Sequence, residues 1–320
     1  MNRRILVTGS SGFIGGHLVA ELLRRGYDVI GVDRHRFPIA SEEACHAALC
    51  DSMREGQRPA RYEHHVLDIR RTALLGDLGR VFGVVHLAAL TGVRASLEDP
   101  VGYFDTNVLG TLNVLDIARR IGAEKVVVAS TSSVYGEQAG PWAEHLPMQP
   151  RSPYAASKAA MEFAVAEWQA RAGIGTDILR FFTVYGPRGR RDMLIGRACE
   201  DIWKGRPVNV FGDGNARRDW TYVADTVRGV TASLEDTTRR LTTINLGSGS
   251  PVSVNELMSA MMLASGCEVK MVYSDTAPGD VPETWADRSR ALELLGWKPE
   301  CTLDHGLRLT WEAALKEMQR

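Results

Sequence analysis

The stretch VTGSSGFIG, residues 7–15, decides the fold. Its glycines at 9, 12 and 15 stand between an apolar run, RILVTG, and FIGGHLVAELLRRG, whose apolar residues recur at helical spacing. Glycines in such a turn let the backbone approach a diphosphate closely, and the start of the helix offers free N–H groups. A glycine triplet alone also suits any tight turn. The strand before it and the helix after it favour a nucleotide site.

Further apolar runs alternate with helical patterns along the first half of the chain. Runs of Val and Ile separated by helices indicate a parallel sheet with helices on both faces, which is a doubly wound α/β fold. Pro, Gly and Arg then cluster from Gly186 onward. We therefore expect a nucleotide-binding domain over 1–182, joined by parts of 220–250, and a smaller substrate-binding domain over 183–320. The expected strands cover 28–34, 62–70, 81–89, 125–131 and 176–186, and the expected helices 103–122 and 154–171.

The composition excludes several classes of protein. The 320 residues are 44% hydrophobic and 24% charged with a net charge of −1, which is ordinary for a globular protein and gives no electrostatic reason to bind nucleic acid or an anionic membrane. No apolar run is long enough for a bilayer span, and no signal peptide is expected. Five scattered cysteines without a Cys-x-x-Cys pair predict inert buried thiols, no metal site and a cytoplasmic protein. A polar insertion at 35–61, expected to be partly helical, carries no legible chemistry.

Acidic residues beyond the glycine turn point to the cofactor. Asp33 ends the second expected strand, where a carboxylate can accept hydrogen bonds from both hydroxyls of an adenosine ribose and repels a 2′-phosphate. Arg34 could accommodate that phosphate, but the carboxylate weighs more, so the sequence predicts NAD rather than NADP. Asp68 falls where it could meet an adenine amino group, and a solvated loop acid is an equal alternative.

The stretch SPYAASK, residues 152–158, carries a candidate base. Tyr154 and Lys158 are four residues apart at the start of a helix, so the ammonium lies beneath the phenol on one face. A free tyrosine titrates near pH ~10, and a neighbouring cation favours the phenolate. Such a phenolate can take a proton from a sugar hydroxyl while hydride leaves to NAD⁺. Tyr-x-x-x-Lys is common by chance, but its position after a nucleotide fold favours function.

A series of motifs in order resembles the extended short-chain dehydrogenase/reductases, in their nucleotide-sugar epimerase/dehydratase group. The resemblance runs nearly end to end and implies a tightly bound NAD, a UDP- or dTDP-sugar, and a homodimer built from the helices near 102–120 and 154–171. The motifs are TGSSGFIG, HLAA, TNVLGTLNVLD, STSSVYG, SPYAASK, RFFTVYGP, VFGDGNARRDWTYVAD, NLGSGSPVSVNEL and PGDVPETWAD. The cofactor residues implied are Gly9, Gly12, Phe13, Ile14, Gly15, Asp33, Arg34, Asp68, Ile69, Leu87, Ala88, Ala89, Asn107, Ala129, Tyr154, Lys158 and Phe181.

The hydroxyl run within ASTSSVYG, residues 129–136, bears on the reaction. In this group the position of Thr131 carries the Ser or Thr that bonds the sugar 4-hydroxyl. The dehydratases that the chain resembles have Asp and Glu at the next two positions, and the sugar-acid decarboxylases have Thr-Ser-Glu. Here Ser132 and Ser133 follow. Without a further acid or base, the oxidised sugar is expected to take hydride back after turning over, which makes the protein an epimerase, an isomerase acting at C4.

The sugar itself is suggested by RFFTVYGPRGRRDM, residues 180–193. Thr183 stands where UDP-galactose epimerases carry Asn, and the run is similar to that of UDP-glucuronate 4-epimerases, as are GVR-x-S and PGDVP-x-T-x-AD. Arg190 suits a C6 carboxylate, together with Thr183 and one of Ser132 or Ser133. Arg191 departs from the subgroup, which usually has Pro there.

We therefore expect conversion of UDP-glucuronate to UDP-galacturonate. UDP-glucose/galactose epimerisation, a related dehydratase or decarboxylase, and a non-catalytic NAD-binding regulator are the alternatives. The expected catalytic residues are Tyr154, Lys158, Thr131 and Ser132. The resemblance places Arg218 on the diphosphate and Asp280 on the ribose. The expected substrate-binding residues are Arg94, Thr131, Ser132, Ser133, Tyr154, Thr183, Arg190, Met193, Val210, Arg218 and Asp280.

Overall fold

The computed structural model describes residues 3–36, 47, 60–74, 78–276 and 280–319. The helix expected in the insertion at 35–61 falls almost wholly outside them. The chain forms two compact units. The first unit comprises Met1–Val134, Pro150–Arg180 and Val227–Ile244, and the second unit comprises Tyr135–Gln149, Phe181–Thr226 and Asn245–Arg320.

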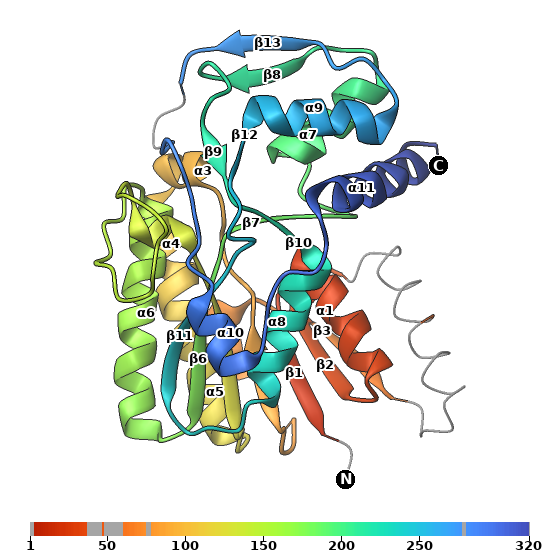
Figure 1. The fold of residues 1–320 in the computed structure, drawn as a ribbon. Helices are drawn as coiled ribbons and strands as arrows, with labels where there is room; N and C mark the ends of the chain where they lie inside the picture. Colours follow the sequence, from red (N-terminus) through yellow and green to blue (C-terminus); the bar gives the residue numbers. More distant parts are fainter. Residues whose placement is uncertain (1–2, 37–46, 48–59, 75–77, 277–279, 320) are drawn as a thin grey trace. The chain divides into compact units, whose positions relative to one another are not determined.

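A seven-stranded sheet organises the first unit, in the order β11-β6-β5-β4-β1-β2-β3 (Figure 1). β1 pairs in parallel with β2 on one side and β4 on the other, so the strand order reverses beside β1, where doubly wound sheets bind ligands. The doubly wound α/β fold is confirmed. The strands are β1 (Arg4–Thr8), β2 (Asp28–Asp33), β3 (Tyr62–Val66), β4 (Gly83–His86), β5 (Lys125–Thr131), β6 (Gly175–Phe181) and β11 (Leu241–Leu246).

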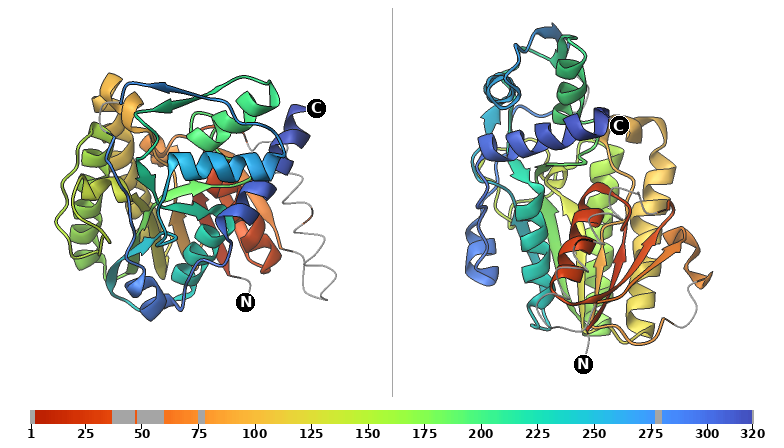
Figure 2. Two further views of the ribbon diagram at one scale, coloured as in Figure 1. Left: turned by 45° about the horizontal axis from the view of Figure 1, so that its top comes forward. Right: turned by 90° about the vertical axis from the view of Figure 1, so that its right-hand side faces the viewer.

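Helices cover both faces of this sheet. α1 and α8 lie on one face, and α5 and α6 lie on the other (Figure 2). The expected helix over 103–122 consists of α4, a π-helical turn and α5 in succession. The helical elements are α1 (Phe13–Arg24), η1 (Ile69–Leu74), α3 (Val93–Glu98), α4 (Pro100–Phe104), η2 (Asp105–Leu109), α5 (Gly110–Arg120), η3 (Ser132–Tyr135), α6 (Pro153–Ala172) and α8 (Val223–Glu235).

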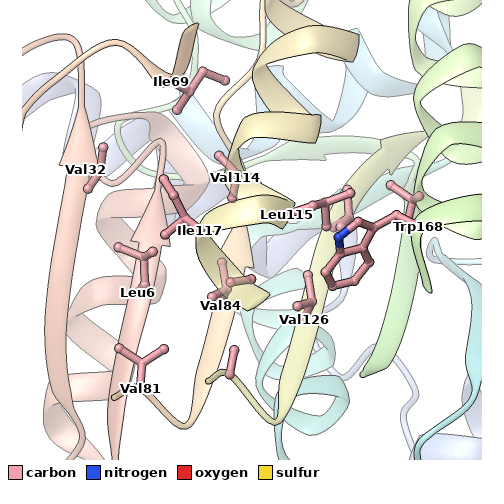
Figure 3. Close-up of a cluster of buried hydrophobic side chains, with 14 of the residues drawn as sticks. Leu6, Val32, Ile69, Val81, Val84, Val114, Leu115, Ile117, Val126 and Trp168 are labelled. Atoms are coloured by element: carbon pink, nitrogen blue, oxygen red, sulfur yellow. The ribbon is translucent and has the colours of Figure 1, made fainter. Parts of the chain in front are cut away.

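The core of the first unit explains why the strands read as continuous apolar runs. Leu6, Val84 and Val126 come from neighbouring strands and are fully buried beneath Val114 and Leu115 of α5 (Figure 3). Burying such a side chain contributes roughly 1.5–3 kcal/mol. The sheet is therefore a rigid platform whose carboxyl ends carry the polar residues described below.

The strands of the second unit are short, as the Pro- and Gly-rich texture predicts, but its helices are not, since α11 has 16 residues. Its core forms where α9 packs on α11, with Leu257, Met261, Leu307 and Trp311 buried. Its paired strands are β7 (Thr183–Tyr185) with β10 (Trp220–Tyr222), β8 (Val208–Phe211) with β13 (Met271–Ser274) and β9 (Arg217–Arg218) with β12 (Val252–Ser253). Its helices are α7 (Leu194–Trp203), α9 (Val254–Ser265), α10 (Ser289–Leu295) and α11 (Leu303–Met318).

The grouping of the chain differs from the expected division in segment 135–149, which belongs to the second unit. The reason is a set of hydrogen bonds distant in sequence. The Tyr135 hydroxyl donates to Asn245 Oδ1 at 2.7 Å, Asn245 Nδ2 donates to the Trp142 carbonyl at 2.8 Å, and Trp142 N donates to the Trp285 carbonyl at 2.7 Å.

The cysteine prediction is partly wrong. Cys199 is buried, and burial raises the pKa of its thiol to about 12, but Cys267 is exposed on the loop after α9. Cys45 and Cys50 lie outside the described residues. Within the described ranges, no three or more His, Cys, Asp or Glu side chains gather as metal ligands would. No helix in the same part of the chain is long and apolar enough to cross a membrane.

Candidate active site

The glycine turn after β1 is so tight that side chains do not fit. Gly9 has φ +73°, and a Cβ there would lie 2.7 Å from the Ala88 backbone nitrogen. A Cβ on Gly15 would overlap the Gly9 carbonyl. Gly12 is the N-cap of α1 and supplies no side-chain hydrogen bond. The first N–H groups of the helix, which begins with Phe13 and Ile14, are therefore not capped by a side chain. Without side chains on the glycines, a ligand can come close to the backbone at this helix N-terminus. Such a site fits the diphosphate of a dinucleotide.

Asp33 is fixed beside this turn. Its Oδ2 accepts from Ser11 N at 3.1 Å and its Oδ1 from His35 N at 3.0 Å. Arg34 is exposed, and its Nε donates to His35 Nε2 at 3.0 Å. The structure thus puts the carboxylate, rather than the guanidinium, against the glycine turn.

Asp68 has a partner that the sequence did not reveal. Arg70 Nη2 lies 2.6 Å from Asp68 Oδ2, and hydrogen bonds from Arg70 lower the pKa of that carboxyl. Arg70 also reaches Asp105 at 3.1 Å. The carboxylate is therefore ionised and oriented, and its contact with an adenine stays a prediction. Ile69 beside it is buried in the core.

The loop after β4 is tied to the π-helical turn η2. Asn107 is buried there. Its Oδ1 accepts from Leu90 N at 2.8 Å, and its Nδ2 donates to the Leu90 carbonyl and to Ser157 Oγ, each at 3.0 Å. Leu87, Ala88 and Ala89 precede this contact and are half-buried. Asn107 therefore joins the predicted cofactor loop to α6.

A buried histidine that the sequence analysis missed reinforces the same region. The Thr111 hydroxyl donates to the Asn107 carbonyl at 2.7 Å, so it accepts from His86 Nε2–H at 2.9 Å. His86 Nδ1 then accepts from the Thr8 hydroxyl at 2.6 Å. Burial, followed by repulsion from Lys158, lowers the pKa of His86 to about 3, so it is neutral. His86 is the first residue of the HLAA motif, but the motif alone does not indicate what the histidine contacts.

Lys158 lies on the face of α6 turned toward β5, and Tyr154 stands one helical turn before it. Ser152 caps the helix by accepting from Ala155 N at 3.1 Å, which places Tyr154 in the first turn. Lys158 Nζ is buried and donates to the Ala129 carbonyl at 2.6 Å. Burial lowers the pKa of Lys158 to about 8, against the opposing effect of Glu162.

Two further contacts orient the phenol. The Tyr154 ring packs edge to face with Tyr103 at a centroid distance of 6.2 Å. The Tyr103 hydroxyl in turn donates to the Thr91 carbonyl at 2.8 Å. Tyr103 was absent from the sequence-based set, because nothing in its local pattern marks it.

The hydroxyl run continues directly from β5 into η3. Thr131 and Ser132 are each 7% exposed, and Ser133 is half-buried. Ser133 N donates to Thr131 Oγ1 at 3.1 Å, and the Thr131 hydroxyl donates to Ser133 Oγ at 3.2 Å. The run contains hydroxyls and no carboxylate. Thr131, Tyr154 and Lys158 all belong to the first unit, as does Arg94, which is exposed on α3.

Three predicted substrate residues of the second unit share one cavity. Thr183, Arg190 and Met193 line a space of about 190 Å³ together with residues of α7 and α11. Arg190 is held by Asp192, with Nε to Oδ1 at 3.0 Å and Nη2 to Oδ2 at 2.5 Å, and this pairing lowers the pKa of the Asp192 carboxyl. Arg191, the departure from the subgroup, lies 3.7 Å from Glu317.

The remaining predicted residues are placed as follows. Arg218 on β9 lies 3.9 Å from Asp280, and burial lowers the pKa of its guanidinium. Val210 is buried within β8, away from the Arg190 cavity lining. Phe181, the last residue of β6, is buried in the second unit.

A family model describing NAD-dependent epimerases and dehydratases matches residues 5–247. The chain belongs to the NAD-dependent epimerase/dehydratase family. The resemblance stated from the motifs is thereby confirmed.

Similar members of the family are known. The UDP-glucuronate 4-epimerase of Thermodesulfobacterium geofontis is 38% identical over 307 residues, covering 95% of this chain and 94% of that protein. MoeE5, solved with NAD and either UDP-glucuronic acid or UDP-glucose, is 36% identical with a TM-score of 0.89, covering 98% of this chain and 99% of that one. The UDP-glucuronic acid 4-epimerase of Bacillus cereus, in complex with UDP-glucuronic acid and NAD, is 34% identical with a TM-score of 0.86 and the same coverage.

Proposed function

We propose that this protein is an NAD-dependent UDP-glucuronate 4-epimerase that interconverts UDP-glucuronate and UDP-galacturonate through a transient 4-keto sugar. The observation that carries the proposal is the hydroxyl run Thr131-Ser132-Ser133 in the same unit as Tyr154 and Lys158, with no acid in it. The relatives with UDP-glucuronate support the sugar. Product analysis with UDP-glucuronate tests the proposal: UDP-galacturonate supports it, and a UDP-pentose or a dehydrated sugar as the main product contradicts it.

Tyr154, Thr131 and Lys158 have distinct proposed roles in the reaction. NAD held at the glycine turn would supply a reversible hydride acceptor for C4 of the sugar. Tyr154, as the phenolate, takes the proton of the sugar 4-hydroxyl, and Thr131 holds that hydroxyl. The Lys158 ammonium favours the phenolate because an opposite charge close by stabilises the ionised form. Tyr154 then returns the proton on reduction.

The cofactor preference follows from the glycine turn. The Gly9 and Gly15 cradle holds the diphosphate, and the fixed Asp33 carboxylate takes the ribose hydroxyls. A 2′-phosphate at that position would meet the Asp33 charge, so NAD is preferred over NADP. The adjacent Arg34 is exposed, and its Nε donates to His35 Nε2 at 3.0 Å.

Arg190 is assigned to the sugar carboxylate, which would share its guanidinium with Asp192. Asp192 engages Nε and Nη2, which fixes the plane of the guanidinium. Charge-assisted bidentate pairs with carboxylates are among the strongest polar contacts of proteins. We assign the UDP-glucuronate carboxylate to Arg190 and Thr183, and the diphosphate and ribose to Arg218 and Asp280. UDP-glucose epimerisation is the second candidate, supported by the UDP-glucose complex of MoeE5.

We also propose a homodimer, working in the cytoplasm. Large apolar side chains are exposed on packed neighbouring helices of the first unit, namely Leu97, Val101, Phe104, Leu109, Leu112 and Phe163. Phe163→Glu is expected to convert the protein from a dimer to a monomer in sedimentation, since it buries a charge at the interface. Leu263→Glu, on the exposed face of α9, is the matched control and should remain dimeric. A wild-type monomer, or a Phe163→Glu dimer of unchanged stability, would contradict this assignment.

A further inference from the structure

A buried ionic cluster lies one helical turn from Lys158. Ser130 Oγ donates to Glu162 Oε1 at 2.5 Å, and Arg180 donates to the same carboxylate through Nε at 3.0 Å and Nη2 at 2.7 Å. The three residues are no more than 4% exposed. Removing two charges from water costs so much that apolar residues of similar volume often serve stability as well or better. Stability alone therefore does not explain this pair.

The position of the cluster relates it to the proposed base. Lys158 and Glu162 are four residues apart on α6 and share one face. Two consecutive residues of β5 bond to them: the Ala129 carbonyl accepts from Lys158, and Ser130 donates to Glu162. Thr131 is the next residue of β5. The cluster thus fixes the register of α6 on the strand that carries the hydroxyl run.

The titratable groups around Lys158 come from three elements, α6, β6 and β4. Tyr154 lies one turn before it on α6 and Glu162 one turn after. Arg180 reaches the Glu162 carboxylate from β6. His86 on β4 is neutral. Among the described groups, Glu162 is the negative charge that acts on Lys158, and it opposes the burial that lowers the Lys158 pKa to about 8.

We propose that Glu162 is a positioning residue for the reaction: with Ser130 and Arg180 it holds Lys158 against β5 and keeps the Lys158 ammonium protonated beneath Tyr154. The inference rests on the roles proposed above for Tyr154 and Lys158. It assigns to Glu162 no contact with substrate or cofactor. Its effect is on the pH range in which the base works.

Glu162→Gln tests the charge. The amide keeps the size of the side chain and an oxygen for the Ser130 hydroxyl. Loss of the negative charge lowers the pKa of Lys158 in the folded protein. On raising the pH, the ammonium therefore loses its proton at a lower pH than in the wild type. The alkaline limb of the kcat profile is expected to move down by about one pH unit. In ultraviolet titration of the protein without turnover, the tyrosinate signal that Tyr154→Phe removes should move to higher pH.

A matched control separates this effect from stability. Lys125 and Asp177 form a second buried pair in the same sheet, with Nζ and Oδ2 2.9 Å apart. Asp177→Asn should lower the thermal midpoint as Glu162→Gln does and leave the alkaline limb in place. Where Glu162→Gln does not fold, Glu162→Gln combined with Arg180→Gln also removes the buried guanidinium that donates to Glu162, and it should move the limb in the same direction.

The inference is overturned if, in folded Glu162→Gln, both the alkaline limb and the tyrosinate titration stay at the wild-type pH. The cluster would then have a structural role alone. Ser130→Ala supplies the other half of the test, because it removes a bond to Glu162 and no charge. It should lower kcat without moving the limb. Tyr154→Phe and Lys158→Met are measured first. Full turnover by either variant would refute the assignment of Tyr154 and Lys158 as the base and its partner, and the inference about Glu162 would fail with it.

Discussion

Replacing Tyr154 with phenylalanine is expected to lower turnover by on the order of 10²–10⁴-fold, the contribution of a general base, while NAD stays bound. The ring, its place in the first turn of α6 and its edge contact with Tyr103 remain, and only the proton acceptor is lost. Product formation from UDP-glucuronate gives the rate. Chromatography of the nucleotide released on denaturing the protein gives the NAD content.

Tyr103→Phe is the matched control for this variant. It also removes one phenol hydroxyl, in this case the donor to the Thr91 carbonyl, and keeps the ring that packs on Tyr154. Its activity should fall far less. Near-normal turnover in folded Tyr154→Phe would show that Tyr154 is not the base.

Arg190→Ala is expected to reduce kcat/KM for UDP-glucuronate roughly 10- to 100-fold. Removing one partner of a charge-assisted hydrogen bond costs about 1.5–3 kcal/mol, and each ~1.4 kcal/mol is a factor of ten. Activity on UDP-glucose, which has no charge at C6, should change much less. Steady-state kinetics with both sugars measures this difference, which a folding defect would not produce because it lowers both rates alike.

Arg191→Ala is the matched control for Arg190→Ala. The neighbouring arginine is more exposed and lies near Glu317, so its loss removes the same charge from the same loop. It should affect both sugars little. A proportional loss with both sugars in Arg190→Ala, or no loss with either, would place Arg190 outside carboxylate recognition.

Local patterns were enough to predict the architecture, and the predicted cofactor turn and base rest on patterns that are just as local. The Gly9 turn, the Asp33 position and the spacing of Tyr154 and Lys158 are each encoded within a few residues, and the structure puts all of them in one unit. Strand runs such as 125–131 were equally clear, because a sheet buried on both faces requires apolar residues at every position.

Contacts between distant parts of the chain could not be predicted in this way. His86 is paired with Thr8, 78 residues earlier, and Tyr135 with Asn245, 110 residues later, so no spacing reveals either contact. The Glu162 carboxylate depends on Arg180 of another element. The exposure of Cys267 was missed because a lone cysteine carries no sign of its burial.

The central claim is that the hydroxyl run allows the oxidised sugar no fate except reduction. A 4-keto glucuronic acid is a β-keto acid, and it loses carbon dioxide when the bond to its carboxylate aligns with the carbonyl. Ser132 and Ser133 stand where the resembling dehydratases and decarboxylases carry acids. The clamp on the carboxylate proposed for Arg190 would also keep that bond out of alignment.

The most direct test is mass spectrometry and NMR of the products formed from UDP-glucuronate by the NAD-loaded protein. The expected product is UDP-galacturonate, of unchanged mass and inverted at C4, with no carbon dioxide and no NADH released. A UDP-pentose or a dehydrated sugar as the main product, or turnover of UDP-glucose with none of UDP-glucuronate, would contradict it.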